Sequence, residues 1–254
     1  MAYQTVFGRY ELKYMLTREQ KEILLQAMAP YMAMDAYGRS TIRNIYFDTD
    51  TYRLIRRSVE KPAYKEKLRL RSYAQASRDS TVFVELKKKY DNVVYKRRLP
   101  LSEADAMQWT AGIKPCPVQT QISREIDYFM EYYGGLKPTM FLSYEREAFY
   151  DKNGGDFRVT FDDRILARQE DVDLTSPAYG EPILEEGMVL MELKCSGGIP
   201  MWMTQVLSRE QIYKTSFSKY GTAYETMLFP RTDLHNAQNE QEKWKDGCSF
   251  YRNF

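Results

Sequence analysis

The chain has 254 residues and a formal net charge of +2, from 37 Lys and Arg against 35 Asp and Glu. Its hydrophobic content of 43% is enough for the core of one large domain. The near balance of charges argues against a nucleic-acid binder with a broad basic surface, so any cationic patch is local. The only histidine, His235, lies in a polar C-terminal segment, which argues against a histidine-based catalytic triad, and zinc sites built from several histidines are excluded.

Cysteine usage and hydropathy predict a cytoplasmic protein. The three cysteines have neither paired nor metal-like spacing, and their odd number argues against a disulfide framework. No apolar run approaches the ~20 residues that span a bilayer, and no signal-peptide pattern is present at the N-terminus. Without a visible linker, we expect one domain over residues 1–230, followed by a polar C-terminal extension over residues 231–254 that is a peripheral helix or a mobile tail.

The first part of the chain alternates between strand and helix patterns. Residues 7–14 alternate charged and apolar side chains, which predicts a strand. A capping box over Thr17 to Gln20 predicts a helix that runs to about Tyr31. A second strand is expected over residues 40–48, and a short helical turn over residues 52–58.

The most informative region consists of three consecutive strands, expected over residues 67–71, 82–89 and 93–98. Turn-forming residues join them, which predicts an antiparallel meander. Because alternate side chains of a strand share a face, each strand gathers its charges on one side. These charges, with those of the first strand, are Arg9, Glu11, Lys13, Lys67, Arg69, Arg71, Glu85, Lys87, Lys89, Lys96 and Arg98.

The ordinary explanation of such a face is the solvated side of a half-buried sheet. However, like charges that oppose each other directly destabilise neighbouring strands. A face composed mostly of Lys and Arg, with few carboxylates, is also unusual for a surface that serves only solubility. The pattern therefore indicates an anionic ligand.

The rest of the chain adds further strands and helices of the same kinds. Strands are expected over residues 139–149, 157–162 and 189–194, again with charge on alternate positions. Amphipathic helices are expected over residues 102–109, 118–133, 200–212 and 218–228.

Together these elements predict an α+β fold. A sheet closed into a barrel with its charged face inward would form a polar, cationic tunnel, and the amphipathic helices would cover its apolar outer face. Two cations ~6 Å apart repel by roughly 3 kcal/mol at an effective dielectric constant near 20, so an empty tunnel would be strained. Arg suits phosphate oxygens through its bidentate fork, and Lys adds adjustable charge. We therefore expect a ligand with several phosphates.

Four carboxylates would share the same space, namely Glu11, Glu85, Asp162 and Glu192. Carboxylate oxygens are suitable ligands for Mg²⁺ or Mn²⁺, and a metal there would bridge phosphate oxygens. The alternative role of each is to neutralise neighbouring Lys and Arg. The residues alone leave both roles open.

At these positions the sequence resembles the VTC domain, the polyphosphate polymerase domain of the vacuolar transporter chaperone family, within the triphosphate tunnel metalloenzymes. Individually the matching segments are weak motifs, and their order and spacing carry the resemblance. The segments are Arg9 to Tyr14, Ile45 to Thr49, Lys67 to Tyr73, Phe83 to Lys87, Lys96 to Arg98, Tyr144 to Phe149, Glu192 to Lys194 and Ser216 to Tyr220.

The resemblance implies an eight-stranded antiparallel tunnel that binds ATP and polyphosphate and depends on Mn²⁺ or Mg²⁺. Its implied reaction transfers the γ-phosphoryl group of ATP to a growing polyphosphate chain. The residues that it implies in catalysis are Lys219, Arg69, Arg71 and Arg146. Those implied in phosphate binding are Lys13, Lys67, Lys87, Lys96, Arg158 and Lys194, and those implied in metal binding are Glu192 and Glu85.

One residue departs from the hydrolytic branch of the superfamily, in which a Glu-x-Glu-x-Lys motif is typical. Here Arg9 replaces the first glutamate, which makes hydrolysis with two metals less favourable. A triphosphatase or polyphosphatase that uses the same tunnel, and a polyphosphate-binding module without catalysis, are the alternatives. A polymerase with no transmembrane segment could not translocate its product by itself, so translocation would need a membrane-protein partner. We expect the polymerase itself in the cytoplasm or at the membrane periphery.

Overall fold

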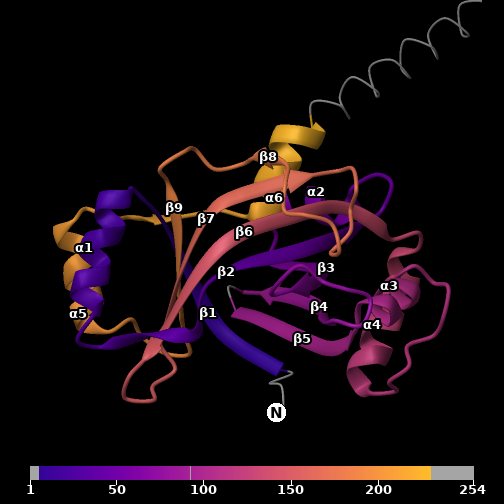
Figure 1. Cartoon of the computed structure of the whole chain (residues 1–254), viewed down its shortest axis with the longest axis horizontal. Coiled ribbons are helices and arrows are strands. Elements are labelled where there is room, and N and C mark those ends of the chain that lie inside the picture. Colours follow the sequence, from indigo (N-terminus) through magenta and orange to yellow (C-terminus); the bar gives the residue numbers. More distant parts are fainter. Residues whose placement is uncertain (1–5, 92, 230–254) are drawn as a thin grey trace, which may run out of the picture.

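The computed structural model describes residues 6–91 and 93–229, so the predicted C-terminal extension over residues 231–254 lies outside the described residues. The fold is mixed α+β, with a large antiparallel sheet and flanking helices (Figure 1). The strands are β1 (Val6–Leu16), β2 (Met32–Asp48), β3 (Tyr64–Ser72), β4 (Thr81–Tyr90), β5 (Val93–Ser102), β6 (Lys137–Asp151), β7 (Arg158–Arg168), β8 (Glu181–Pro182), β9 (Val189–Cys195) and β10 (Lys214–Thr215). The helices are α1 (Arg18–Met28), α2 (Arg53–Val59), α3 (Glu103–Thr110), α4 (Gln121–Tyr133), α5 (Met201–Arg209) and α6 (Lys219–Ala223), which a π-helical turn (Tyr224–Leu228) follows.

The strands pair in the order β10-β1-β5-β4-β3-β2-β6-β7-β8, and every pair is antiparallel. Strand β9 stands outside this order because it pairs with β1 on one side and with β7 on the other. Followed from strand to strand, the pairings pass from β1 through β5, β4, β3, β2, β6, β7 and β9 and return to β1. Strand β9 thus bridges β1 and β7, while the two-residue strands β10 and β8 stand at the two ends of the strand order.

The predicted meander of three strands is confirmed as β3, β4 and β5. Its register places Lys67 opposite Lys87 and Lys87 opposite Lys96, so three lysines lie side by side across the three strands. In the next row, Arg69 lies opposite Glu85. Directly opposed residues share a face, so these side chains belong to one charged face of the sheet.

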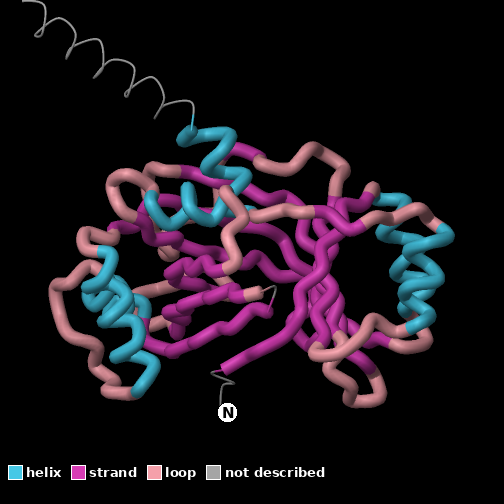
Figure 2. Tube along the Cα trace, turned by 180° about the vertical axis from the view of Figure 1, so that it is seen from behind, coloured by secondary structure: helices cyan, strands magenta, loops and turns pink. Residues whose placement is uncertain are grey.

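The apolar alternate residues lie on the other face and contact the helices. Leu68, Val84 and Leu86 belong to one buried cluster with Trp109 of α3 and Ile126 of α4. A second cluster joins alternate residues of β1, β7 and β9 to α1 and α5. Figure 2 shows these two helical pairs at opposite ends of the molecule. Apolar burial against the helices thus turns the charged face away from them.

A third cluster covers one end of the charged face. Tyr220 of α6 stacks on Tyr46 of β2 with ring centroids 4.7 Å apart, and both pack with Leu142 and Leu190. The hydroxyl of Tyr220 donates to Asp48, which also accepts the backbone N–H groups of two residues in the first turn of α2. Asp48 therefore ties α2 and α6 to the end of β2.

Several predicted boundaries were wrong. Strand β2 begins at Met32 rather than at residue 40, because its first part pairs with the far end of β6 and a register shift separates the two parts. Helix α5 ends at Arg209 rather than at residue 212, and Gln211 has a left-handed backbone (φ 52°). Helix α4 begins at Gln121 rather than at residue 118, since Thr120 caps it. No helix within the described ranges is long and apolar enough to cross a membrane.

Candidate functional site

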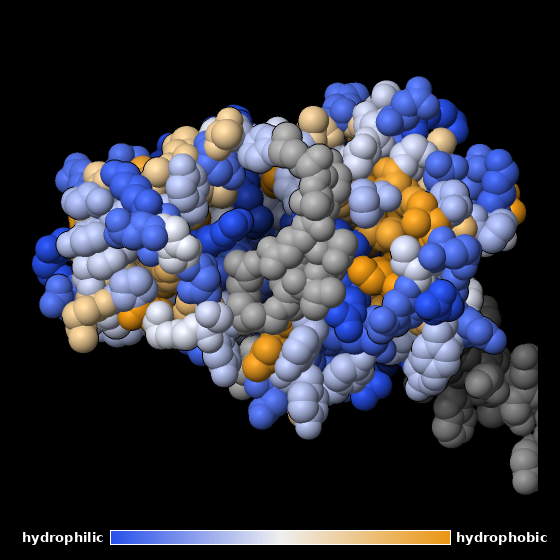
Figure 3. All heavy atoms as spheres, turned by 90° about the horizontal axis from the view of Figure 1, so that it is seen from below, coloured by the Kyte–Doolittle hydropathy of each residue, from blue (hydrophilic) through white to orange (hydrophobic). Residues whose placement is uncertain are grey.

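The charged face is concave, because its side chains meet across strands that are not neighbours. Lys87 of β4 contacts Glu11 of β1 at 2.8 Å, although β5 pairs between these strands. Arg146 of β6 lies 3.5 Å from Glu192 of β9, with β7 between them. Figure 3 shows a hollow whose visible part is lined by hydrophilic residues. This concave surface contains two carboxylate-centred clusters.

The Glu85 cluster consists of Glu85 and four cations of β3 and β5. Oε2 of Glu85 accepts from Nη2 and Nε of Arg69 at 2.6 and 2.8 Å and lies 3.9 Å from Arg71. Oε1 lies 3.3 Å from Lys96 and 3.5 Å from Arg98. Burial of this fully buried carboxylate opposes its charge, but the four cations hold the pKa of Glu85 well below its usual value.

Neutral side chains fix the two arginines of β3. Arg69 donates to the hydroxyl of Tyr46 at 3.1 Å. Arg71 donates to Oδ1 of Asn44 and to the hydroxyl of Tyr144, each at 2.9 Å. Their guanidinium planes are therefore held in place without a ligand, which suits bidentate recognition of phosphate.

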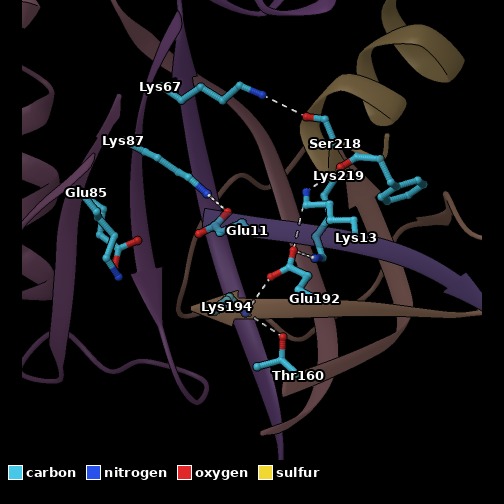
Figure 4. Close-up of polar contacts among 12 residues, drawn as sticks. Glu11, Lys13, Lys67, Glu85, Lys87, Thr160, Glu192, Lys194, Ser218 and Lys219 are labelled. Atoms are coloured by element: carbon cyan, nitrogen blue, oxygen red, sulfur yellow. Dashed lines mark hydrogen bonds and ion pairs between the residues drawn. The ribbon is translucent and has the colours of Figure 1, made fainter. Parts of the chain in front are cut away.

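The Glu192 cluster joins residues that are far apart in the sequence (Figure 4). Glu192 lies 2.9 Å from Nζ of Lys194, 3.4 Å from Lys219, 3.5 Å from Arg146 and 3.6 Å from Lys13. Burial opposes the charge of Glu192, but these cations hold its pKa well below the usual value. Helix α6 supplies Lys219 at its first residue.

Asp162 anchors two members of the same cluster. It accepts two hydrogen bonds from Arg146 and one from Lys219, all at 2.6 Å. Burial disfavours the ammonium of Lys219, but Asp162 and Glu192 raise the pKa of that group above its usual value. Nζ of Lys219 also lies 4.5 Å from the ring centroid of Tyr144. The two carboxylates thus favour the charged form of Lys219 in the concave surface.

Two lysines of the concave surface, Lys67 and Lys13 of the Glu192 cluster, have neutral hydrogen-bond partners. Lys67 is hydrogen bonded to the neutral hydroxyl of Ser218 at 3.0 Å, and Lys13 donates to the carbonyl oxygen of Phe217 at 2.5 Å (Figure 4). Burial, together with repulsion from Lys13 and other cations, lowers the pKa of Lys67 well below its usual value. Positive charge therefore exceeds what the carboxylates of the concave surface neutralise.

The pKa shifts of other groups in the concave surface reflect the close packing of its charges. Burial lowers the pKa of Lys96 to about 7 and that of Lys194 to about 8, although Glu85 and Glu192 oppose the respective shifts. Burial is the largest single influence on Glu11 and would raise its pKa, but the charges of Lys87 and Lys194 and the hydrogen bond from Lys87 together lower it to about 2. An added polyanion would relieve the repulsion among these cations.

Comparison with known proteins shows which family has this arrangement. The sequence matches the VTC domain over residues 8–228. The chain belongs to the VTC domain family. This confirms the family that the sequence motifs predicted, and the match includes every charged residue of the two clusters. No curated protein matches the sequence.

Solved structures share the fold of this VTC domain. A candidate adenylate cyclase from Bacillus halodurans superposes with a TM-score of 0.54 at 15% identity, over 85% of this chain and 96% of that chain. A candidate adenylyl cyclase from Hippeastrum, described as having a dominant triphosphatase activity, superposes with a TM-score of 0.51 at 14% identity, over 87% of this chain and 98% of that chain. At such identities the likeness is one of fold.

The structure brings most of the predicted site residues of the VTC domain together. Arg158 differs from the others: it lies opposite Lys194 in the β7–β9 ladder but is exposed. The residues brought together are Lys13, Lys67, Arg69, Arg71, Glu85, Lys87, Lys96, Arg146, Glu192, Lys194 and Lys219.

Sequence patterns did not identify some neutral members of this surface. Asn44 and Tyr46 bind the two arginines of β3. Ser40 and Ile42, which precede them at alternate positions of β2, have no charge, so the alternation of charges gave no signal there. Their positions opposite Arg71 and Arg69 follow only from the β2–β3 register.

The carboxylates of this VTC domain are the candidate ligands of a metal ion. Among the described residues, no group of three or more His, Cys, Asp or Glu side chains could hold a metal ion. Glu85 does not fit a metal, because it is fully buried and surrounded by four cations. Glu192 also has four cations around it, but it is slightly exposed and, once phosphates pair with those cations, fits the kind of Mg²⁺ or Mn²⁺ site in which one or two carboxylates and substrate phosphates share the ion.

Proposed function

We propose that this chain is a metal-dependent polyphosphate polymerase, which transfers the γ-phosphoryl group of ATP to a growing polyphosphate chain. The observation that carries the proposal is the concave surface on which buried and partly buried Lys and Arg outnumber the carboxylates and form two preorganised clusters. Membership of the VTC domain family supports it.

In this proposal, the eight strands whose pairings return to β1 enclose a tunnel within a domain of residues 1–230. The charged face forms its inner wall, as the contacts across non-neighbouring strands support. The apolar face would lie outside under α1, α3, α4 and α5, in agreement with the two apolar clusters. Residues 231–254 would form a separate extension.

The reaction needs no protein nucleophile. A terminal phosphate oxygen of the acceptor chain attacks the γ-phosphorus of ATP, the bond from that phosphorus to the bridging β–γ oxygen breaks, and ADP leaves with the electron pair. Catalysis then consists of positioning and charge stabilisation. The rigid guanidinium groups of Arg69 and Arg71 would hold phosphate oxygens, and Lys219 and Arg146 would stabilise the charge on the transferred group.

Lysines would hold the rest of the polyanion. Their flexible ammonium groups bind phosphate without demanding a fixed orientation, which suits a chain that must move after each addition. The proposed phosphate-binding residues are Lys13, Lys67, Lys87, Lys96, Lys194 and Arg158. Arg158 would act near an exposed end of the surface rather than in its buried part.

Glu192 would hold the divalent cation, with phosphate oxygens as the other ligands. When bound, Mn²⁺ or Mg²⁺ would offset negative charge on the phosphates during transfer. The cations that now surround Glu192 would then pair with phosphate oxygens instead. Glu85 would keep the arginines of β3 in place and would not bind metal.

The partners in this proposal are ATP and polyphosphate, without nucleic acid. We place the protein in the cytoplasm or at the membrane periphery, where a membrane-protein partner would translocate the product. A stable complex with such a partner would be detected by co-purification from membranes.

The test is to incubate the protein with ATP and Mn²⁺ or Mg²⁺ and to resolve the products by gel electrophoresis and phosphorus NMR. We expect long chains with internal-phosphate resonances and a matching amount of ADP. Lys219→Ala should reduce chain formation by about 10²- to 10³-fold, because a buried cation near the transferred group is lost. The exposed Lys214→Ala is the matched control and should retain activity.

Other products would favour other functions. Release of orthophosphate without chains would favour a triphosphatase, an activity described for the Hippeastrum protein of the same fold. Tight polyphosphate binding without turnover would favour a binding module. Chain formation that Lys219→Ala leaves unchanged would contradict the assignment of this residue.

A further inference from the structure

The charged face ends in an aromatic pair beside the arginines of β3. Tyr73 directly follows β3 and continues the alternation of Arg69 and Arg71, while Phe83 of β4 lies opposite Arg71. Alternate positions on a strand are ~6.7 Å apart, so Tyr73 lies one step beyond Arg71, while Phe83 lies beside Arg71 on the next strand. Neither aromatic residue has a role in the phosphoryl transfer proposed above.

Arg98 fixes this pair and links it to the Glu85 cluster. Its guanidinium carbon lies 3.5 Å from the ring centroid of Phe83 and 5.4 Å from that of Tyr73. Nη2 of Arg98 donates to the hydroxyl of Tyr73 at 2.8 Å, and Nε lies 3.5 Å from Glu85. The two rings meet edge to face, with centroids 5.6 Å apart. The orientation of the Tyr73 ring is therefore set by its hydroxyl and by its neighbour.

The two rings differ in exposure. Phe83 is 5% exposed, whereas Tyr73 is 44% exposed. Packing in the interior explains why Phe83 is buried. The ring of Tyr73, in contrast, is held in one orientation but remains in contact with solvent. The other end of the charged face is covered by the apolar cluster of Tyr46, Tyr220 and Leu142. A molecule with its phosphates on Arg69 and Arg71 would therefore extend toward Tyr73.

We infer that Tyr73 is the stacking platform for the base of the nucleoside triphosphate, with Arg98 as the positioning residue that orients it. This inference rests on the proposed function and adds the subsite for the non-phosphate part of the substrate. Stacking on an aromatic ring tolerates every base and depends on its π surface, so the larger purines bind best. Inorganic polyphosphate has no base and makes no use of this subsite.

The test compares two ligands in isothermal titration calorimetry with Mg²⁺ present, namely the β,γ-imido analogue of ATP and inorganic tripolyphosphate. Tyr73→Ala should weaken binding of the ATP analogue by about 5- to 100-fold. It should change binding of tripolyphosphate by less than about twofold. Tyr73→Phe, which keeps the ring, should retain most of the affinity for the analogue. Tyr128→Ala, at an exposed tyrosine of α4, is the matched control and should bind both ligands as the wild type does.

The outcomes separate this inference from the proposed function. If Tyr73→Ala weakens both ligands equally, or neither, the subsite is wrong while the phosphate site stands. Equal loss in Tyr73→Phe and Tyr73→Ala would show that the hydroxyl acts rather than the ring, which also overturns stacking. Wild-type protein that binds neither ligand would overturn the inference and the proposed function together.

Discussion

The two carboxylate clusters contain similar charges but differ in how they are built. The Glu85 cluster lies on three consecutive strands and is rich in arginine, and its carboxylate is 0% exposed. The Glu192 cluster draws on β1, β6, β7, β9 and α6, contains three lysines and one arginine around its carboxylate, and leaves Glu192 7% exposed. The Glu85 cluster is formed by neighbouring strands, and its carboxylate is closed off from solvent. The Glu192 cluster joins segments that are distant in the sequence, and its carboxylate keeps a small exposed area.

This difference indicates a division of labour. Guanidinium groups in a sealed cluster keep one geometry, so the Glu85 cluster is suited to support the arginines that hold phosphate. Ammonium groups around a carboxylate that keeps a small exposed area can change partners, so the Glu192 cluster is suited to the exchange of phosphates and metal. Substitutions at the two carboxylates should therefore have different consequences.

The largest effect is expected on stability, at Glu85. Glu85→Gln leaves Arg69, Arg71, Lys96 and Arg98 without their shared countercharge, and breaking a buried ion pair in this way costs about 3–5 kcal/mol. We expect this decrease in the free energy of unfolding, measured by urea denaturation in buffer without phosphate. Glu125→Gln, which breaks a partly exposed pair with Arg97, should cost less than about 1 kcal/mol. Equal stability of the two variants would contradict the supporting role of Glu85.

The next effect is expected on the metal requirement, at Glu192. Glu192→Gln removes the carboxylate charge while keeping the shape of the side chain. We expect the Mn²⁺ concentration for half-maximal chain formation to rise at least about tenfold. Glu11→Gln tests whether the neighbouring carboxylate of β1 contributes to the same ion. An unchanged Mn²⁺ requirement in Glu192→Gln would remove this residue from the metal site.

The smallest effect is expected from pH and concerns the lysines of both clusters. Without ligand, Lys96 and Lys194 have pKa values of about 7 and 8. A bound polyanion favours their charged forms and raises both pKa values, so binding takes up protons and affinity falls as pH rises. We expect affinity for tripolyphosphate to fall several-fold between about pH 6.5 and 8.

Calorimetry in buffers with different ionisation enthalpies measures this proton uptake directly. Lys96→Arg is the matched variant, because arginine stays protonated throughout the range and should flatten the dependence on pH. Binding without proton uptake in the wild type would show that the two lysines are already charged before the ligand arrives.

The eight longer strands, most helices and the charged residues of the Glu85 cluster could be predicted from the sequence, whereas the two-residue strands β8 and β10 could not. Alternation has a period of two, and the cluster involves only consecutive strands joined by short connections, so local rules determine which charges share a face. The capping box at Thr17 predicted the start of α1 for the same reason, since its hydrogen bonds are local. The motifs also identified the VTC domain family, which the match over residues 8–228 confirms.

Only the tertiary structure decided which residues meet in the Glu192 cluster and which end of the charged face is open. Lys13 and Lys219 approach Glu192 because β9 pairs between β1 and β7 and because α6 packs through Tyr220 on Tyr46. No local pattern contains these contacts, since they depend on strand order and on apolar packing between distant segments. The position of Tyr73 at the site also could not be predicted from a local pattern. Its alternation with Arg71 is visible in the sequence, but its exposure and its contact with Arg98 result from the packing of three strands.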